Sequence, residues 1–342
     1  LVTTASDAVD PSDGETSLRE AIAFANAGGP DGDTGTAETI AFAPALDGAT
    51  IRVDDLLRIT EPVTIDGDLD DDRAPDITIS GDFAQAYGTT TDANGNTVAD
   101  LAGAIFPDTG RVLDIDAATG PGEAVTLDGL VITGGSGGRP IAGAGVNAGS
   151  GRTVIENSSI SGNAGLSALA ASGPLELDNV LLDRNFAPLA GLEIAGTGAL
   201  VGSAVTIRDT GGGPGLRIGP DATGELTDAG ILGNSLDNPR GSGGGIRNEG
   251  TLEIRSSEVT GNAASSGGGI FNEGVLTLVS TTVSENDARE TGGGLFNAGT
   301  ARLEASAISD NTAESGAGIA NLSRGGSDGM LTVADSTVSG ND

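Results

Sequence analysis

The stretch GGGIFNEGVLTL at residues 267–278 decides the fold, because copies of it lie on both sides. A close copy, GGGIRNEGTLEI, starts at Gly243, and shorter copies start at Gly292 (GGGLFNAG) and Gly316 (GAGIAN). These starting positions are 24, 25 and 24 residues apart. Self-similarity at a period of this length is the signature of a repeat architecture, in which each unit is one supersecondary element.

Every unit has the same internal pattern. A short apolar alternation is followed by two small polar residues, one apolar residue and an Asn. The alternating positions are Leu252 and Ile254, Leu276 and Leu278, and Leu331 and Val333; the single apolar residues are Val259, Val283, Ile308 and Val338; the closing residues are Asn262, Asn286, Asn311 and Asn341. A period of two indicates short strands with one buried face, and the Gly, Asn, Ser and Asp between them are turn residues.

Weaker copies extend the pattern upstream, at Val125, Leu127 and Ile132, at Ile155, Ile160 and Asn163, at Leu175, Leu177, Leu182 and Asn185, and at Leu226, Ile231 and Asn234. One unit cannot bury its own apolar face, but stacked units can. We therefore predict an all-β fold, a right-handed parallel β-helix of about ten coils with 22–25 residues each. A leucine-rich repeat needs a different Leu pattern, and propeller blades are longer, at about 40 residues.

The two ends of the chain differ. Ser17 and Glu20 form a capping box that opens a helix, and Leu18, Ala21, Ile22 and Ala25 fall on one of its faces. We expect residues 1–50 to form a cap with an amphipathic helix over 17–27, followed by the β-helix over 51–342, with irregular coils over 51–240 and regular repeats over 241–342. The last residues, 338–342, follow the normal repeat phrase, so we expect the chain to be a fragment, or a subunit whose last coil meets a partner.

Composition excludes several classes of function. The chain has 342 residues, no Cys, no His and a net charge of −33. Without thiol or imidazole groups there is no zinc finger, cysteine nucleophile or Ser-His-Asp triad. The charge repels nucleic-acid phosphates, and no apolar run approaches the ~20 residues of a membrane span, so neither nucleic-acid binding nor membrane insertion of this segment is expected.

Two segments carry a resemblance to known families. The start of the chain through GETSLREAI at residues 14–22 resembles the N-terminal module of bacterial surface proteins named for a CSLREAI signature, although Thr16 stands where that signature has Cys. The GGGIxNxGxL repeats are similar to those of polymorphic outer-membrane-protein-like β-helix proteins. The resemblance implies an exported surface protein, often the passenger of a larger adhesin.

Two charged clusters are candidate sites. The segment 66–72 places five carboxylates, Asp66, Asp68, Asp70, Asp71 and Asp72, around a Gly turn, and hard Ca²⁺ prefers six to eight oxygen ligands. We expect Ca²⁺ there, or a solvated acidic loop. Asp183-Arg184 and Arg208-Asp209 lie at the ends of two expected strands, and we expect them to meet on neighbouring coils. They are candidates for polysaccharide chemistry, with a surface ion pair as the alternative.

The recurring Asn and Phe residues favour a structural interpretation. The series of Asn262, Asn286 and Asn311, and that of Asn248, Asn272, Asn297 and Asn321, predict stacked ladders that hold turns in register. Phe271 and Phe296 occupy the same repeat position and are expected to stack on each other.

The sequence favours a secreted or cell-surface structural module, such as a stalk, an adhesin passenger or a filament subunit, with no catalytic residues. The alternative is a β-helix that binds or cleaves polysaccharides as a lyase does. Expected partners are cell-surface or matrix components, glycans, or further copies of the chain stacked end to end. The only cofactor expected is Ca²⁺.

Overall fold

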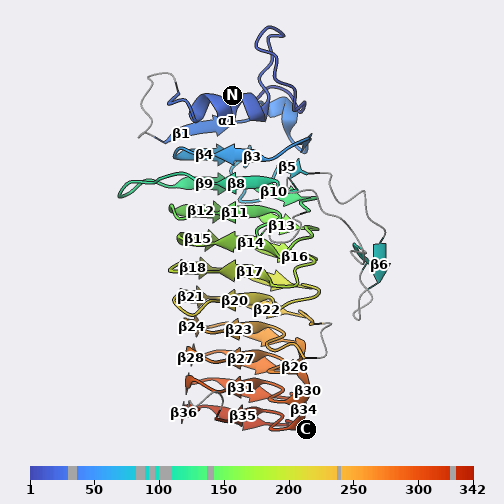
Figure 1. Cartoon of the computed structure of the whole chain (residues 1–342), viewed down its shortest axis with the longest axis vertical. Coiled ribbons are helices and arrows are strands. Elements are labelled where there is room, and N and C mark those ends of the chain that lie inside the picture. The colour runs from blue at the N-terminus through green and yellow to red at the C-terminus, as the bar shows by residue number, and fades with distance from the viewer. Residues whose placement is uncertain are drawn as a thin grey trace.

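A computed structural model describes residues 1–29, 37–81, 89–91, 97–99, 110–136, 142–236, 240–323 and 329–342. The chain winds into a rod of stacked coils, with the N-terminus at one end and the C-terminus at the other (Figure 1). The fold is all-β and consists of about ten turns of a right-handed parallel β-helix, which confirms the prediction from the repeats.

Three long parallel sheets run along the rod, and we number them I, II and III. Sheet I contains β1 (Glu38–Ala41), β4 (Val63–Asp66), β9 (Val125–Asp128), β12 (Thr153–Glu156), β15 (Pro174–Asp178), β18 (Ala199–Ser203), β21 (Thr223–Thr227), β24 (Thr251–Arg255), β28 (Val275–Val279), β32 (Thr300–Glu304) and β36 (Met330–Ala334). Sheet II contains β2 (Thr50–Arg52), β5 (Ile77–Ser80), β10 (Leu130–Thr133), β13 (Ser159–Ser161), β16 (Leu181–Asp183), β19 (Thr206–Arg208), β22 (Gly230–Leu232), β25 (Glu258–Thr260), β29 (Thr282–Ser284), β33 (Ala307–Ser309) and β37 (Thr337–Ser339).

Sheet III contains β3 (Leu57–Ile59), β8 (Leu113–Ile115), β11 (Val146–Ala148), β14 (Ser167–Ala171), β17 (Ala190–Ile194), β20 (Leu216–Ile218), β23 (Ile246–Asn248), β27 (Ile270–Asn272), β31 (Leu295–Asn297) and β35 (Ile319–Asn321). A fourth, short sheet pairs β26 (Ala263–Ser266), β30 (Asp287–Thr291) and β34 (Thr312–Ser315) in the last coils. The other elements among the described residues are the helix α1 (Leu18–Ala25), the 3₁₀ turn η1 (Pro44–Leu46) and an antiparallel pair, β6 (Thr89–Thr91) and β7 (Thr97–Ala99).

The register of the strands follows the sequence repeat. Leu252 lies opposite Leu276, and Ile254 lies opposite Leu278, so equivalent residues of successive units are neighbours in space. Coils lengthen where the repeat carries an insertion; Leu303 pairs with Val333, 30 residues later. Inward-facing aliphatic residues form one buried cluster from Val2 to Ile308, as stacking of units that cannot bury themselves requires.

From β9 onward, each corner between sheets I and II contains one residue in the left-handed region. Ser256, Ser280 and Ala305 occupy this corner in successive coils, with φ of 49°, 51° and 47°. One residue with positive φ turns the chain sharply without a long loop. The corner therefore keeps the coils thin enough for every strand to pair with its equivalents above and below.

Both Asn ladders form as predicted. Asn262 Nδ2 donates to Asn286 Oδ1 and Asn286 Nδ2 donates to Asn311 Oδ1, each at 2.9 Å. In the second ladder, Asn248, Asn272, Asn297 and Asn321 are joined by Nδ2–Oδ1 hydrogen bonds of 2.7 Å. Except for the exposed Asn321, these residues are buried, so the ladder hydrogen bonds pair amide groups that would be costly to leave unpaired there. Asn248 Oδ1, at the start of the second ladder, has no hydrogen-bond partner among the described residues.

The helix α1 (Leu18–Ala25) covers the first coil at the N-terminal end (Figure 1). Its capping box is present, since Ser17 Oγ accepts from Glu20 N and the Glu20 carboxylate accepts from Ser17 N. Leu18, Ala21, Ile22 and Ala25 are its buried face, as the periodicity predicts.

Candidate functional site

The acidic segment predicted as a cation site lies between β4 and β5. Asp66 ends β4, residues 67–76 form the loop, and Ile77 begins β5. Several of the loop carboxylates bond to the loop's own backbone: Asp68 accepts from Asp72 N and Arg73 N, and Asp72 accepts from Ala74 N. The loop is therefore organised largely by its own carboxylates.

Asp68, Asp70 and Asp76 are the carboxylates that converge within this loop. One oxygen from each lies within 4.8 Å of the others, close enough to ligate one cation. Asp66, Asp71 and Asp72 are not part of this group. Asp76 was missed in the sequence because it stands outside the compact run 66–72; its place directly before β5 was the available signal.

A second feature of this corner was also missed, a column of carboxylates that we call the carboxylate ladder. Asp66, Asp128, Glu156 and Asp178 end successive strands of sheet I and lie opposite one another in register. Adjacent strands are about 4.8 Å apart, so the four like charges are held in a close row. The strand sequences VTID, VTLD, TVIE and LELD all end in a carboxylate, which is the pattern that would have found it.

Arg73 connects the loop to the carboxylate ladder. Its Nη2 lies 2.9 Å from Asp178 Oδ2, and its Nε donates to Asn157 Oδ1 at 3.2 Å. Asn157 in turn donates to Asp128 Oδ1 at 2.9 Å, and Asn179 donates to the Arg73 carbonyl at 3.2 Å. The loop thus extends over three coils and brings one positive charge to a strongly negative corner.

The electrostatics of this corner disfavour full ionisation. Burial raises the pKa of Asp66, and the charge of Asp128 adds to the rise, although the N–H of Asp68 opposes it. Burial also raises the pKa of Glu156, together with the charges of Asp128 and Asp178. Partial desolvation raises the pKa of Asp70, followed by the charge of Asp72. A bound cation would relieve this repulsion.

The second predicted cluster is brought together as an ion pair. Asp183, only 2% exposed, ends β16, and Arg208 ends β19 directly opposite it. Arg184 Nε donates to Asp183 Oδ2 at 2.8 Å, and Arg208 Nε donates to Asp183 Oδ1 at 2.9 Å. A buried carboxylate with both oxygens held by guanidinium groups is a compensated pair, since removing either arginine would leave it short of a partner. Asp209 follows at a corner with φ of 52°.

A stripe of alternating charge runs along the outer face of sheet III. Arg217 bridges Glu193 and Glu249 across coils, with N–O distances of 2.9 and 2.6 Å. Arg247 continues the row with contacts to Glu249 at 2.9 Å and to Glu273 at 3.5 Å. Burial raises the pKa of Glu193, while the charge of Arg217 opposes the rise. These bridges join neighbouring coils to each other.

The same stripe ends in the two phenylalanines. The Arg247 guanidinium lies 5.6 Å from the centre of the Phe271 ring, and Phe271 stacks on Phe296 with ring centres 4.7 Å apart and planes within 9°. This confirms the predicted Phe–Phe stack. Both rings are buried, so the stack is part of the packing of the rod and offers no aromatic surface to a ligand.

Comparison with known proteins assigns no role to the residues described above. No family model matches the chain, and no curated protein matches it. The resemblance of residues 1–22 to the CSLREAI module, and that of the repeats to adhesin passengers, therefore stay predictions. A crystal structure of pectate lyase Pel9A is similar over 99% of this chain and 78% of that one, with a TM-score of 0.36 and 12% identity. An identity of 12% is too low to carry the role of any residue across.

In the part of the chain that the structure describes, no helix has the length and apolar character needed to cross a membrane.

Proposed function

We propose that the chain is a rigid structural module of a secreted or cell-surface protein, which spans distance and presents its surface to matrix components or glycans. The observation that carries this proposal is the continuity of contacts between coils. The aliphatic spine, two Asn ladders and bridging arginines such as Arg217 all join one coil to the next. The charged cluster around Asp183 is likewise engaged between coils.

A test of catalysis separates this proposal from the lyase alternative. The protein is incubated with polygalacturonate, alginate and sulfated glycans in the presence of Ca²⁺, and absorbance of unsaturated uronate products is followed. We expect no product. Sustained product formation that is lost in Asp183→Ala or Arg208→Ala, with each variant still folded by circular dichroism, would replace the structural role with a lyase.

We further propose that Ca²⁺ binds the acidic loop as a stabilising ion. The convergence of Asp68, Asp70 and Asp76 and the raised pKa of Asp70 support this. Metal-free protein is expected to melt at a higher temperature when Ca²⁺ is added, and Asp76→Asn should remove most of that increase. Asp310→Asn, at a distant corner, is the matched control. Identical melting curves with Ca²⁺ and with chelator would reject the site.

A further inference from the structure

Four glycines lie within the described strands, and they are Gly191, Gly202, Gly224 and Gly230. At the first three, an added Cβ atom would lie 3.0 Å or less from an atom of another residue, so close packing requires the glycine there. At Gly230 the nearest atom would be Leu232 Cδ1 at 3.4 Å, an ordinary van der Waals contact, and the backbone does not adopt a positive φ. Neither packing nor backbone conformation therefore requires a glycine at residue 230.

Gly230 faces outward at the start of β22 and belongs to a row of outward residues along sheet II. Its neighbours in this row are Thr206 of β19 and Glu258 of β25, which lie opposite it in register. From β10 to β37, every other strand of the sheet has a side chain at this position. A glycine within a strand weakens it and often marks a place where a ligand comes close to the backbone. The gap at Gly230 is therefore a candidate binding site.

A shallow hollow of about 770 Å³ surrounds this gap on the outside of the rod. Its lining extends over four successive coils, from Thr206 on β19 to Thr282 on β29. β22 lies between the two ends of the rod (Figure 1), and it is paired on both sides, so the hollow is formed within the stack. The half-buried Leu232 leans towards Gly230 and gives the hollow an apolar wall.

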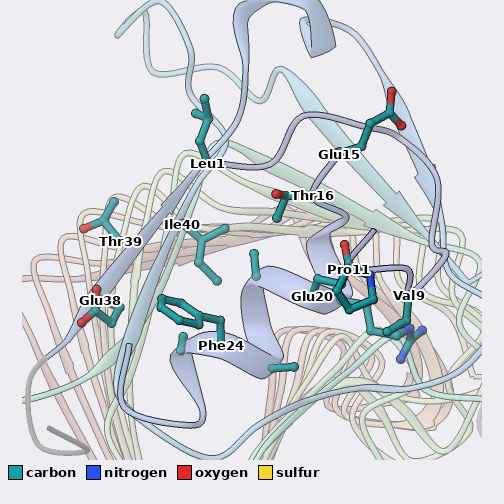
Figure 2. Close-up of a pocket in the computed structure, with 14 residues that line it drawn as sticks. Leu1, Val9, Pro11, Glu15, Thr16, Glu20, Phe24, Glu38, Thr39 and Ile40 are labelled. Carbon is teal, nitrogen blue, oxygen red and sulfur yellow. The ribbon is translucent and has the colours of Figure 1, made fainter. Parts of the chain in front are cut away.

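The chemistry of this hollow differs from that of the groove at the N-terminal end. That groove lies beside α1 and β1 and has a mainly apolar lining, with Phe24 and Ile40 on one side of it (Figure 2). The sheet II hollow is instead lined by four accessible hydroxyl groups, those of Thr206, Ser256, Ser280 and Thr282. In the part of the chain that the structure describes, none of the four side chains has a hydrogen-bond partner. A hydroxyl group both donates and accepts, so this lining suits a ligand that is itself rich in hydroxyl groups.

Two exposed carboxylates complete the lining. Asp228 lies at the corner before β22, and Glu258 lies in the row beside Gly230. Neither carboxylate forms an ion pair with any residue that the structure describes. Arg208 and Arg255, which lie within two residues of the lining along the chain, are each paired with another carboxylate. The hollow therefore favours a ligand that carries positive charge and disfavours uronates and sulfated glycans.

We propose that this hollow binds a linear glycan with free amino groups, which lies along the axis of the rod. The proposal rests on the surface-presenting role proposed above, and it names the class of glycan. Coils repeat every ~4.8 Å, close to the length of one sugar unit in an extended chain, so successive coils offer polar groups to successive units. Sugar hydroxyls pair with the Ser and Thr hydroxyls, and ammonium groups pair with Asp228 and Glu258.

A peptide suits the hollow less well than a glycan. The strands β19, β22 and β25 are paired on both sides, so their backbone groups are already used in the ladder. A peptide lying on this face would find side chains but no strand edge to pair with. A glycan needs no strand edge, because its polar groups are hydroxyls and amines.

The test measures fluorescence anisotropy of a labelled chitosan hexamer, which is a chain of glucosamine units, with the whole protein. At about pH 5.5 the sugar amines are protonated and ordinary carboxylates are ionised, and about 0.15 M NaCl screens distant charges. We expect saturable binding. The chitin hexamer, which has the same backbone with acetylated amines, and the galacturonate hexamer should each bind at least about tenfold more weakly.

A variant that leaves the charge unchanged locates the glycan, because a protein with a charge of −33 attracts polycations over its whole surface. Gly230→Leu fills the hollow, and Leu181 shows that the same row accepts a leucine. Binding should weaken by about tenfold or more, while the melting temperature stays equal or rises, since glycine weakens a strand. Ala307→Leu, three strands further along the row, is the matched control and should bind as the parent does.

Charge variants test the role of the two carboxylates. Asp228→Asn and Glu258→Gln should each weaken binding of the chitosan hexamer by about threefold or more and leave binding of the chitin hexamer unchanged. Asp335→Asn is the matched control, because Asp335 occupies the equivalent corner of a distant coil, with φ of 51° against 53° at Asp228. Circular dichroism and melting curves show whether each variant is folded.

Three results would overturn the proposal. The first is a Kd above about 1 mM for the chitosan hexamer. The second is an equal effect of Gly230→Leu and Ala307→Leu on binding, which would mean that the attraction is spread over the acidic surface. The third is tighter binding of a hexalysine peptide that Gly230→Leu abolishes, which would assign the hollow to a basic peptide. Each of these leaves the structural role standing, because that role is tested by the absence of uronate products.

Discussion

Asn286 shows how much one residue contributes to this fold. Its Oδ1 accepts from Asn262 N and Nδ2, and its Nδ2 donates to Val259 O and Asn311 Oδ1, all at 2.9 Å. The residue is buried, so Asn286→Ala would leave groups on both neighbouring coils without partners. We expect a loss of about 3 kcal/mol in the free energy of unfolding, measured by urea denaturation.

Asn341→Ala is the control for that measurement. Asn341 is the rung after Asn311 in the same ladder and is half-buried; in the described residues its hydrogen bonds to other coils go to the coil before it, to Asn311 and Ile308. The expected loss is less than half of that at Asn286. Equal losses of unfolding free energy at the two positions would mean that burial within the stack does not determine how much each Asn contributes to stability.

Thr210 interrupts the same ladder between Asn185 and Asn234. Its N–H donates to Asn234 Oδ1 at 3.0 Å, but its buried Oγ1 has no hydrogen-bond partner among the described residues. Thr210→Asn supplies an amide where the other coils have one, and we expect it to stabilise the protein by about 1 kcal/mol. Thr210→Val removes the unpaired hydroxyl without adding the amide, so it should stabilise less. A destabilised Asn variant beside a neutral Val variant would contradict this reading.

At this scale the sequence was most informative where residues recur. The Asn ladders and the Phe271–Phe296 stack follow from identical positions in successive repeats. Asp76 was missed because it stands outside the compact run 66–72, and the carboxylate ladder was missed because its grouping depends on which coil lies above which. The irregular spacing between Asp66 and Asp128 hid that register, since 62 residues separate two strands that are neighbours.

At the scale of elements, the carboxylates that end successive strands of sheet I repel one another and destabilise the fold. The pKa of Glu156 is raised in the folded state, by burial first and then by Asp128 and Asp178. A carboxyl group with a raised pKa binds protons more tightly in the folded chain, so its ionisation destabilises the fold. Glu156→Gln should therefore raise the melting temperature at pH 7. That advantage should shrink as the pH falls through the folded pKa of Glu156, where the parent residue becomes neutral.

Glu176 on β15 is the matched control. Hydrogen bonds from Arg152 at 2.8 and 2.7 Å lower the pKa of Glu176. Its contribution to stability is present above the unfolded pKa of about 4.3 and is lost as the pH falls through the lower folded value. Glu176→Gln should therefore lower the melting temperature at pH 7. A shift in the same direction for both variants would show that the local charges do not decide the effect.

Apolar alternation predicted the strands of sheet I, and the single apolar residue of each unit lies in the strands of sheet II, but no pattern predicted the fourth sheet. Its strands β26, β30 and β34 read AASS, DARET and TAES, with no alternation to distinguish them from loops. They pair because the neighbouring coils align their backbones, with a register shift within each pair. Strands formed by stacking alone leave no signal in a single repeat.

For the whole molecule, net charge opposes the compact state. The net charge of −33 on 342 residues means that the excess acidic side chains repel one another. Salt at about 1 M shortens the screening length to about 3 Å and so weakens this repulsion. We expect the melting temperature to rise steadily from 0.05 to 1 M NaCl. The control is a non-ionic osmolyte at the same osmolality, which is excluded from the protein surface but does not screen charge. A smaller rise in melting temperature with the osmolyte than with NaCl would assign the difference to screening. A melting temperature that is flat in NaCl would show that ion pairs such as Arg217–Glu193 already balance the repulsion.

The strands lie across the rod, and the two termini lie at opposite ends (Figure 1). Tension applied through the termini would therefore pull along the inter-strand hydrogen bonds and load them a few at a time. The chain would peel from an end in discrete ruptures. A typical coil, such as that from Leu252 to Leu276, would release roughly 80 Å of slack. A molecule built this way would unfold one coil at a time under a sudden load, and it could refold onto the coils that remain.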